Sequence, residues 1–247
     1  MIGRVIWIAA LVVIGVITAQ LQFDRQSARN PGMVDMVAVP FRGYSQPSIT
    51  AAALLSDDPS YGLIEAQRLV QRRPLPAEHL TLLAQAYAKV GDLETASLAI
   101  QVAAQRGWRD PLPQEAIARL ALLSGDVPEA TRRFTALMVL GRDNDELLSD
   151  LAGEIFGEPL SPGIVTLADI ISGTERWQKT FLRRGPRIMP PDAFAAVMQA
   201  SSEQGAWIEC AQLERAARSI RRQDLGASDA AETIANLPCT NRGKLRV

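Results

Sequence analysis

The stretches GDLETASLAI (residues 91–100) and GDVPEATRRF (residues 125–134) decide the fold class of this 247-residue chain. Each begins with Gly-Asp, continues through three variable residues to an alanine, and reaches a large apolar residue four positions later. The interval from Gly91 to Gly125 therefore acts as a repeat period. A period of roughly 34 residues is typical of stacked helix–turn–helix units, because one such unit cannot bury its apolar face alone. The repeat predicts an all-α fold made of paired helices.

Each stretch also carries the residue types that a helix–turn–helix junction needs. Glycine has no Cβ and readily adopts the left-handed conformation that ends many helices, so Gly91 and Gly125 suit the C′ position. Asp92 and Asp126 suit the N-cap of the next helix, where a carboxylate accepts hydrogen bonds from free backbone N–H groups. Glu129 follows Asp126 at the spacing of a capping box.

The residues before each Gly-Asp pair keep the same period. The first set is Leu80, Leu83, Ala84 and Tyr87, and a shift by one period gives Ile117, Ala118 and Ala121. This order of large, small and aromatic residues resembles the W-x-x-L-G-x-x-Y run of the tetratricopeptide repeat family, although Ala121 stands where that family prefers a large residue. The resemblance extends over about residues 43–156, as a degenerate first repeat, two good repeats and a half repeat. It points to single-pass, membrane-anchored tetratricopeptide proteins of Gram-negative bacteria.

The N-terminus is apolar enough to enter a membrane. Residues 5–19 read VIWIAALVVIGVITA, and no charge follows until Asp24. Extended to residue 23, the run is roughly 28 Å long as a helix, which just spans a bilayer. An uncleaved signal anchor and a cleavable signal peptide both fit. Ala19 suits position −1 of a cleavage site but Ile17 is poor at −3, so we favour the anchor. Either reading predicts a body outside the cytoplasm. The anchor, which we favour, would hold the body in the bacterial periplasm at the inner membrane.

The chain is therefore expected to have four regions. They are a transmembrane signal anchor (1–23), a linker or stalk (24–47), tetratricopeptide-like repeats forming a short solenoid (48–157), and a C-terminal helical region that caps the stack or forms a small bundle (158–247). Within the last region, Gly and Pro positions predict helices over 163–172, 174–184, 191–203, 206–222 and 228–236. The pair Gly185-Pro186 is expected to end the second of them.

Two cysteines, Cys210 and Cys239, fit an exported protein. An even number of cysteines in an oxidising compartment allows one disulfide, and the alternative is a pair of buried free thiols. A bridge would close a loop of about 28 residues, worth about 3 kcal/mol in the chain-entropy treatment.

Composition and motifs indicate no chemistry of catalysis. The 26 basic and 27 acidic residues give a net charge of −1, so no general attraction to nucleic acid is expected. The one histidine, His79, lacks neighbours at metal-ligand spacing and is expected to be an exposed or half-exposed helix residue. No nucleophile elbow, P-loop or dinucleotide-binding motif occurs in the sequence. We therefore predict no catalytic residue, no cofactor and no metal.

The resemblance implies a binding surface for a protein or peptide. In the tetratricopeptide family the first helix of each repeat lines a groove that holds a peptide or a partner helix. By position, Thr81, Gln85 and Lys89 would line it in one repeat, and Glu115 and Arg119 in the next. The expected function is a non-catalytic, membrane-anchored scaffold or assembly factor.

Two alternatives remain. One is an enzyme or enzyme subunit with its site in residues 158–247, acting for example on an envelope glycan. There the run TERWQKTFLRRGPRIMPPD (174–192) carries clustered arginines that could face an anionic glycan or a phosphate, or be a solvated helix face. The other is a structural subunit in which the anchor helix matters most.

Overall fold

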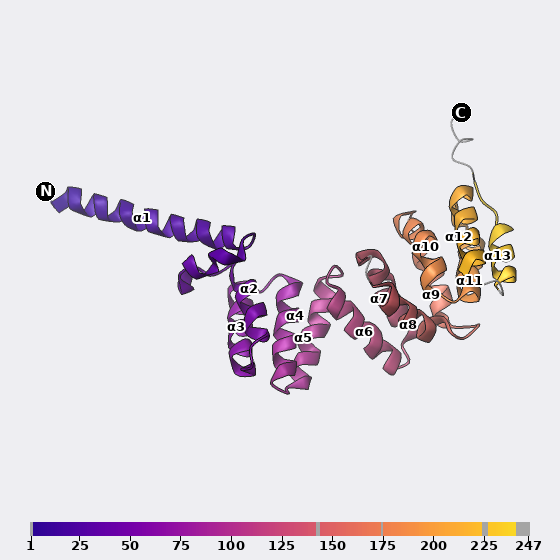
Figure 1. Cartoon of the computed structure of the whole chain (residues 1–247), viewed down its shortest axis with the longest axis horizontal. Coiled ribbons are helices and arrows are strands. Elements are labelled where there is room, and N and C mark those ends of the chain that lie inside the picture. Colours follow the sequence, from indigo (N-terminus) through magenta and orange to yellow (C-terminus); the bar gives the residue numbers. More distant parts are fainter. Residues whose placement is uncertain (1, 142–143, 174, 224–226, 241–247) are drawn as a thin grey trace, which may run out of the picture. The chain divides into compact units, whose positions relative to one another are not determined.

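The computed structural model of the chain describes residues 2–141, 144–173, 175–223 and 227–240 (Figure 1). These residues form helices and connecting turns, and no strand occurs among them. The all-α fold class is therefore confirmed. The chain divides into two compact units, Met1–Gly107 and Trp108–Val247, and each is described here by itself.

Unit 1 begins with α1 (Ile2–Ser27), which is long and apolar enough to cross a membrane. The most apolar stretch of α1 is not buried against any other part of the described chain. A signal sequence meets the same criterion of length and composition, so the anchor and the signal peptide both remain consistent with it. Two short 3₁₀ helices follow, η1 (Pro31–Met36) and η2 (Val39–Phe41).

A buried carboxylate fixes the chain where it leaves α1. Asp24 accepts hydrogen bonds from the backbone N–H groups of Gly43, Tyr44 and Ser45 at 2.8–3.0 Å, and from the Ser45 hydroxyl at 2.7 Å. Arg72 adds a second tie, donating to the carbonyl oxygens of residues 39 and 42 at 2.9 and 2.8 Å. The segment expected as a stalk is therefore folded back onto the end of α1 and the end of α3.

The rest of unit 1 consists of two helical hairpins. Their helices are α2 (Gln46–Leu54), α3 (Pro59–Arg72), α4 (Ala77–Lys89) and α5 (Leu93–Arg106). The interior is small and partly polar. Leu54, Ala66 and Ala86 form one apolar cluster, and beside α2 the Glu65 carboxylate is buried, where it accepts a hydrogen bond from the Gln46 amide at 2.6 Å.

Unit 2 holds eight helices over its described residues, and α6 and α7 form its first hairpin. They are α6 (Pro111–Leu123), α7 (Val127–Leu140), α8 (Asp145–Phe156), α9 (Pro162–Ser172), α10 (Glu175–Ile188), α11 (Pro191–Glu203), α12 (Cys210–Gln223) and α13 (Ser228–Ala235). A single large apolar core joins them. Three fully buried phenylalanines lie in it, and the rings of Phe181 and Phe194 stack with centroids 4.8 Å apart.

The two Gly-Asp junctions are built alike, as predicted. Gly91 and Gly125 have φ angles of +86° and +77°. Each pair forms the two hydrogen bonds of a Schellman turn: Gly91 donates to Ala88 at 3.1 Å and Asp92 to Tyr87 at 3.0 Å, and the second junction repeats the pattern. Asp92 and Asp126 then accept from the backbone N–H three residues on, each at 3.0 Å. The predicted C′ glycines and N-cap aspartates are confirmed.

The prediction that Gly185-Pro186 ends a helix is wrong. Helix α10 continues to Ile188 with Pro186 inside it. Proline cannot donate to the carbonyl four residues earlier and its ring crowds that carbonyl, so the helix continues at an energetic cost, which the burial of Phe181, Leu182 and Ile188 on α10 offsets. Gly185 has its own reason for being glycine, because a Cβ there would lie 2.7 Å from Phe194 Cε2. The pair therefore allows close helix packing.

The C-terminal segment is tied to the start of α12. Cys210 and Cys239 form a disulfide. Beside it, Thr240 donates to the Ile208 carbonyl at 2.9 Å and Cys210 donates to Thr240 at 3.2 Å, which makes an isolated parallel bridge. Residues 206–209, expected in the helix, are extended so that this pairing can form.

Candidate functional site

A cleft of about 820 Å³ opens on unit 2 between α10 and α12, with the start of α8 at one end. Of the residues that the structure describes, five basic side chains and one acidic side chain line it, in a chain whose net charge is −1. We call it the basic cleft. Its charged residues are Lys179, Arg183, Arg184 and Arg187 from α10, Arg215 from α12, and Asp145 from α8.

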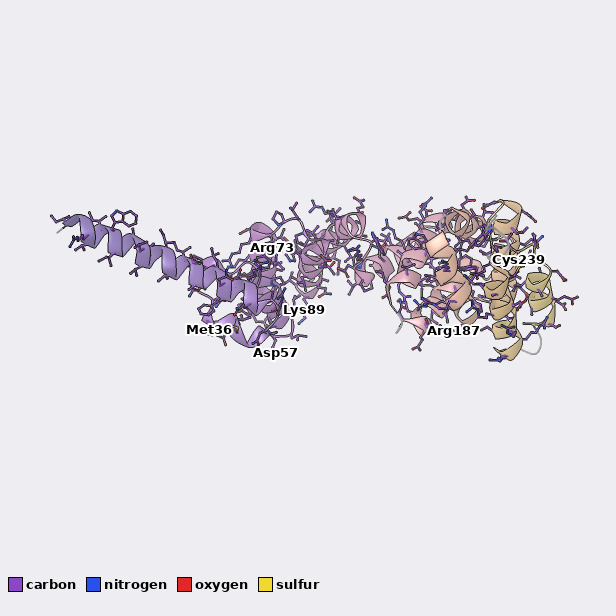
Figure 2. The ribbon with its side chains drawn as sticks, turned by 90° about the horizontal axis from the view of Figure 1, so that it is seen from above. Met36, Asp57, Arg73, Lys89, Arg187 and Cys239 are labelled. Carbon is purple, nitrogen blue, oxygen red and sulfur yellow. A yellow bond between two sulfur atoms is a disulfide. The ribbon has the colours of Figure 1, made fainter. Side chains whose placement is uncertain are left out.

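The helical period places these charges in rows. Lys179, Arg183 and Arg187 are four residues apart on α10, so they lie on one face with a rise of about 6 Å between neighbours. On the opposite wall, Gln212, Arg215 and Ser219 follow one another at helical spacing on α12. Arg187, which is labelled in Figure 2, is the last residue of this row.

Arg184 lies at the buried end of the cleft, and hydrogen-bond acceptors of unit 2 surround its guanidinium group. Its guanidinium donates to the carbonyl oxygens of Met138 and Gly141, to Asn144 Oδ1 at 2.8 Å, and to the Asp145 carboxylate, with Nε 3.1 Å from Oδ1. The Arg184 side chain is 5% exposed. The planar guanidinium has five N–H donors in a fixed fork, against three on a lysine ammonium, so it can satisfy all of these acceptors together. Arg184 therefore joins α10 to the end of α7 and the start of α8.

The other arginines of the cleft are far less compensated. No acidic side chain of the described residues forms an ion pair with Arg183 or Arg215. Arg215 donates from Nε to the Ala211 carbonyl at 2.9 Å, and its two terminal nitrogens have no partner among the described residues. Arg187 approaches Asp145 only at 3.9 Å, and that carboxylate already binds Arg184. The cleft thus holds uncompensated guanidinium groups on both walls.

The groove residues predicted in unit 1 are largely engaged within the fold. Thr81 is 5% exposed and its hydroxyl lies 3.4 Å from the Ala77 carbonyl. The Lys89 ammonium reaches across to α2 and donates to the carbonyls of Leu54 and Ser56, so it covers the end of that helix (Figure 2). Gln85 is half-buried on α4. The Lys89 charge therefore has a structural role that the sequence did not reveal.

The groove residues predicted in unit 2 contact each other. Glu115 and Arg119 form an i,i+4 ion pair on α6 with Arg119 Nε 3.1 Å from Glu115 Oε1, and both side chains are exposed. Exposed pairs of this kind contribute only about 0.3–0.5 kcal/mol. Another carboxylate could therefore replace Glu115 as the partner of Arg119 at little energetic cost.

The expectation that His79 is an exposed residue is wrong. His79 is 5% exposed, and its Nδ1 lies 2.8 Å from the Arg73 carbonyl. Burial lowers the pKa of His79 below the usual 6.5, and this outweighs the opposing effect of the hydrogen bond to Arg73. The helical pattern of the sequence could not show that His79 is buried. Residues 73–76, which pass next to His79, have no periodic pattern from which their position could be predicted.

Comparisons with protein-family models, with curated proteins and with solved structures found no match to this chain. Any inference about function therefore rests on the geometry of the molecule itself.

Only the α10 wall of the basic cleft could be predicted from the sequence. The arginines of α10 stood out as a cluster, but Arg215 and Asp145 did not, because they come from helices whose pairing with α10 was unknown. The i,i+4 spacing of Lys179, Arg183 and Arg187 was the available signal. It would have predicted one charged row, without the opposite wall.

Proposed function

We propose that this protein is a membrane-anchored helical scaffold that holds a protein partner in the bacterial envelope, without catalysis of its own. In this proposal α1 is an uncleaved anchor in the inner membrane and the body lies in the periplasm. The hairpins of α4–α5 and α6–α7 are tetratricopeptide-like units, and the helices after α8 cap the stack.

The observation that carries the proposal is the identical construction of the two Gly-Asp junctions. Both have a left-handed glycine, the same Schellman hydrogen bonds and the same N-cap geometry, one repeat period apart. Repeated hairpins of this kind are used mainly as binding scaffolds, since stacking them creates an extended surface. A buried small residue recurs in each hairpin, as Ala84, Ala96, Ala118 and Ala130.

The enzyme alternative requires carboxylates that converge in a pocket of the C-terminal region. Among the residues that line the basic cleft, Asp145 is the one acidic side chain, and it is paired with Arg184. That arrangement favours anion binding over acid–base catalysis, so we retain the scaffold as the proposed function.

Site-specific photo-crosslinking in native membranes tests the proposal. A crosslinking residue placed at Gln85 or at Arg119, on the first helix of each hairpin, should capture one partner, seen as an adduct of the same mass from both positions. The matched controls are the exposed second-helix positions Gln105 and Arg132, which should give no adduct. Adducts from the controls alone would contradict the groove, and no adduct from any position would contradict docking.

A topology fusion tests the location separately. Alkaline phosphatase joined after residue 247 folds only outside the cytoplasm, because it needs disulfides. We expect an active fusion. An inactive but intact fusion would place the body in the cytoplasm and remove the periplasmic part of the proposal.

A further inference from the structure

The basic cleft is an unexplained concentration of positive charge. Among the described residues that line it, four of the five cations are arginines, and the one apolar side chain is Leu182, which is itself buried. A groove that holds the apolar face of a partner helix is lined by hydrophobic residues. The cleft has the opposite character, so its occupant is recognised by charge.

The arrangement of the arginines narrows the class of ligand. Arg183 and Arg215 reach the cleft from opposite walls, and neither has an acidic partner among the described side chains. Arg187 extends the row on α10. A guanidinium donates two parallel hydrogen bonds to a carboxylate or phosphate, so two facing guanidinium groups suit an anion held between them.

The charge and the volume of the cleft indicate whether its ligand carries phosphate or carboxylate groups. The cleft has about 820 Å³, within the usual range of small-molecule sites. Three of its guanidinium groups, those of Arg183, Arg187 and Arg215, have no acidic partner closer than 3.9 Å among the described side chains. A phosphate monoester carries nearly two negative charges and three acceptor oxygens, whereas a carboxylate carries one charge. Two phosphate groups would therefore balance these three cations, but three carboxylates would be needed to do the same in that space.

We propose that the basic cleft binds a ligand with two or more phosphate groups, gripped by Arg183 on one wall and Arg215 on the other. Arg184 is a positioning residue, because its bonds to the end of α7 and to Asp145 hold α10 in place. The ligand is either a free polyphosphorylated molecule or the headgroup of an anionic lipid, since both present this chemistry. The site is independent of the docking role proposed above.

Calorimetric titration of the full-length protein in non-ionic detergent with inorganic pyrophosphate tests the site. We expect one site per chain, with inorganic phosphate binding at least tenfold more weakly because it offers less charge and fewer acceptor oxygens to the guanidinium groups. Arg183→Gln and Arg215→Gln should each weaken pyrophosphate binding by about tenfold or more, the usual loss for a charge-assisted hydrogen-bonding group. Both arginines are exposed, so neither change should disturb the fold.

The control is Arg221→Gln, an exposed arginine on α12 that does not line the cleft. It removes the same charge and should change the affinity by less than about twofold. Equal losses for all three variants would show a diffuse charge effect and overturn the site, as would the absence of pyrophosphate binding. Tighter binding of a polyglutamate peptide, with the same dependence on Arg183 and Arg215, would overturn the phosphate assignment in favour of an acidic protein segment.

Nanodiscs distinguish the two sources of phosphate. The full-length protein is titrated with pyrophosphate in discs of phosphatidylcholine alone and in discs that also contain phosphatidic acid. If a lipid headgroup occupies the cleft, the second discs should weaken pyrophosphate binding by competition, and Arg183→Gln should abolish the difference between discs. If the ligand is free in solution, the affinities should agree in both.

Discussion

Replacing Arg184 by methionine should destabilise unit 2, although its neighbour Arg183 should tolerate the same change. Methionine keeps the apolar stem of the side chain and removes the guanidinium. The change leaves the buried Met138 carbonyl without this donor, and it also removes charge-assisted hydrogen bonds to Asn144 and Asp145.

The magnitude follows from how well each former partner can be solvated afterwards. An unsatisfied buried carbonyl costs about 1–3 kcal/mol, and breaking a buried ion pair costs about 3–5 kcal/mol. The Asp145 side chain is 41% exposed and can return to water, so the upper part of that range does not apply. We expect Arg184→Met to lower the free energy of unfolding by about 3 kcal/mol, and Arg183→Met to change it by less than about 0.5 kcal/mol.

Urea unfolding followed by tryptophan fluorescence is the appropriate assay. Three of the four tryptophans lie in unit 2, and Trp108 and Trp177 have ring centroids 6.3 Å apart, so the signal reports mainly on that unit. The midpoint should move while the slope stays constant. Equal midpoints for the Arg184→Met and Arg183→Met proteins would refute the structural role given to Arg184.

Three further predictions concern stability. Replacing both cysteines by alanine opens a loop with a sequence separation of 29 and should cost about 3.5 kcal/mol in the same urea assay; a loss below about 1 kcal/mol would contradict it. Gly185→Ala forces a Cβ against the ring of Phe194 and should cost about 1–3 kcal/mol, whereas Gly153→Ala, on α8 with nothing within 4 Å, should stabilise slightly. Because the pKa of His79 is lowered in the folded state, stability should be complete above pH 6.5 and fall as the pH drops from there towards the folded-state pKa; circular dichroism melting of His79→Gln should show a flatter pH dependence.

The parts of the fold that could be predicted are those whose cause is local. The junctions at Gly91 and Gly125 follow from one left-handed glycine and one capping aspartate, both of which can be read in the sequence. The Gly185-Pro186 pair looks equally local, and there the same reasoning failed. Its glycine responds to Phe194, which belongs to the next helix, so a contact between helices decided the outcome.

The candidate site shows the same division between local and tertiary causes. The row of Lys179, Arg183 and Arg187 is visible as an i,i+4 pattern within one helix. The sequence does not show which of the two adjacent arginines is buried. Arg184 is buried and Arg183 is exposed because α7 ends, and α8 begins, beside Arg184. In unit 1, Lys89 was assigned to a partner, yet it donates to the end of α2, which lies 35 residues earlier in the chain.

The unequal interiors of the two units affect how the molecule opens. The apolar side chains that unit 1 buries are mostly alanines, with Leu54, Leu69 and Leu80 as the larger ones, and they lie with the buried Glu65 carboxylate. Unit 2 encloses large aromatic and aliphatic side chains throughout. Apolar burial is the main source of resistance to opening, so amide hydrogens of α2 and α3 should exchange with deuterium through excursions of unit 1 alone. A protease should then cleave unit 1 first and leave a resistant fragment of unit 2 that keeps the basic cleft. Loss or rearrangement of unit 1 should therefore leave the basic cleft of unit 2 intact.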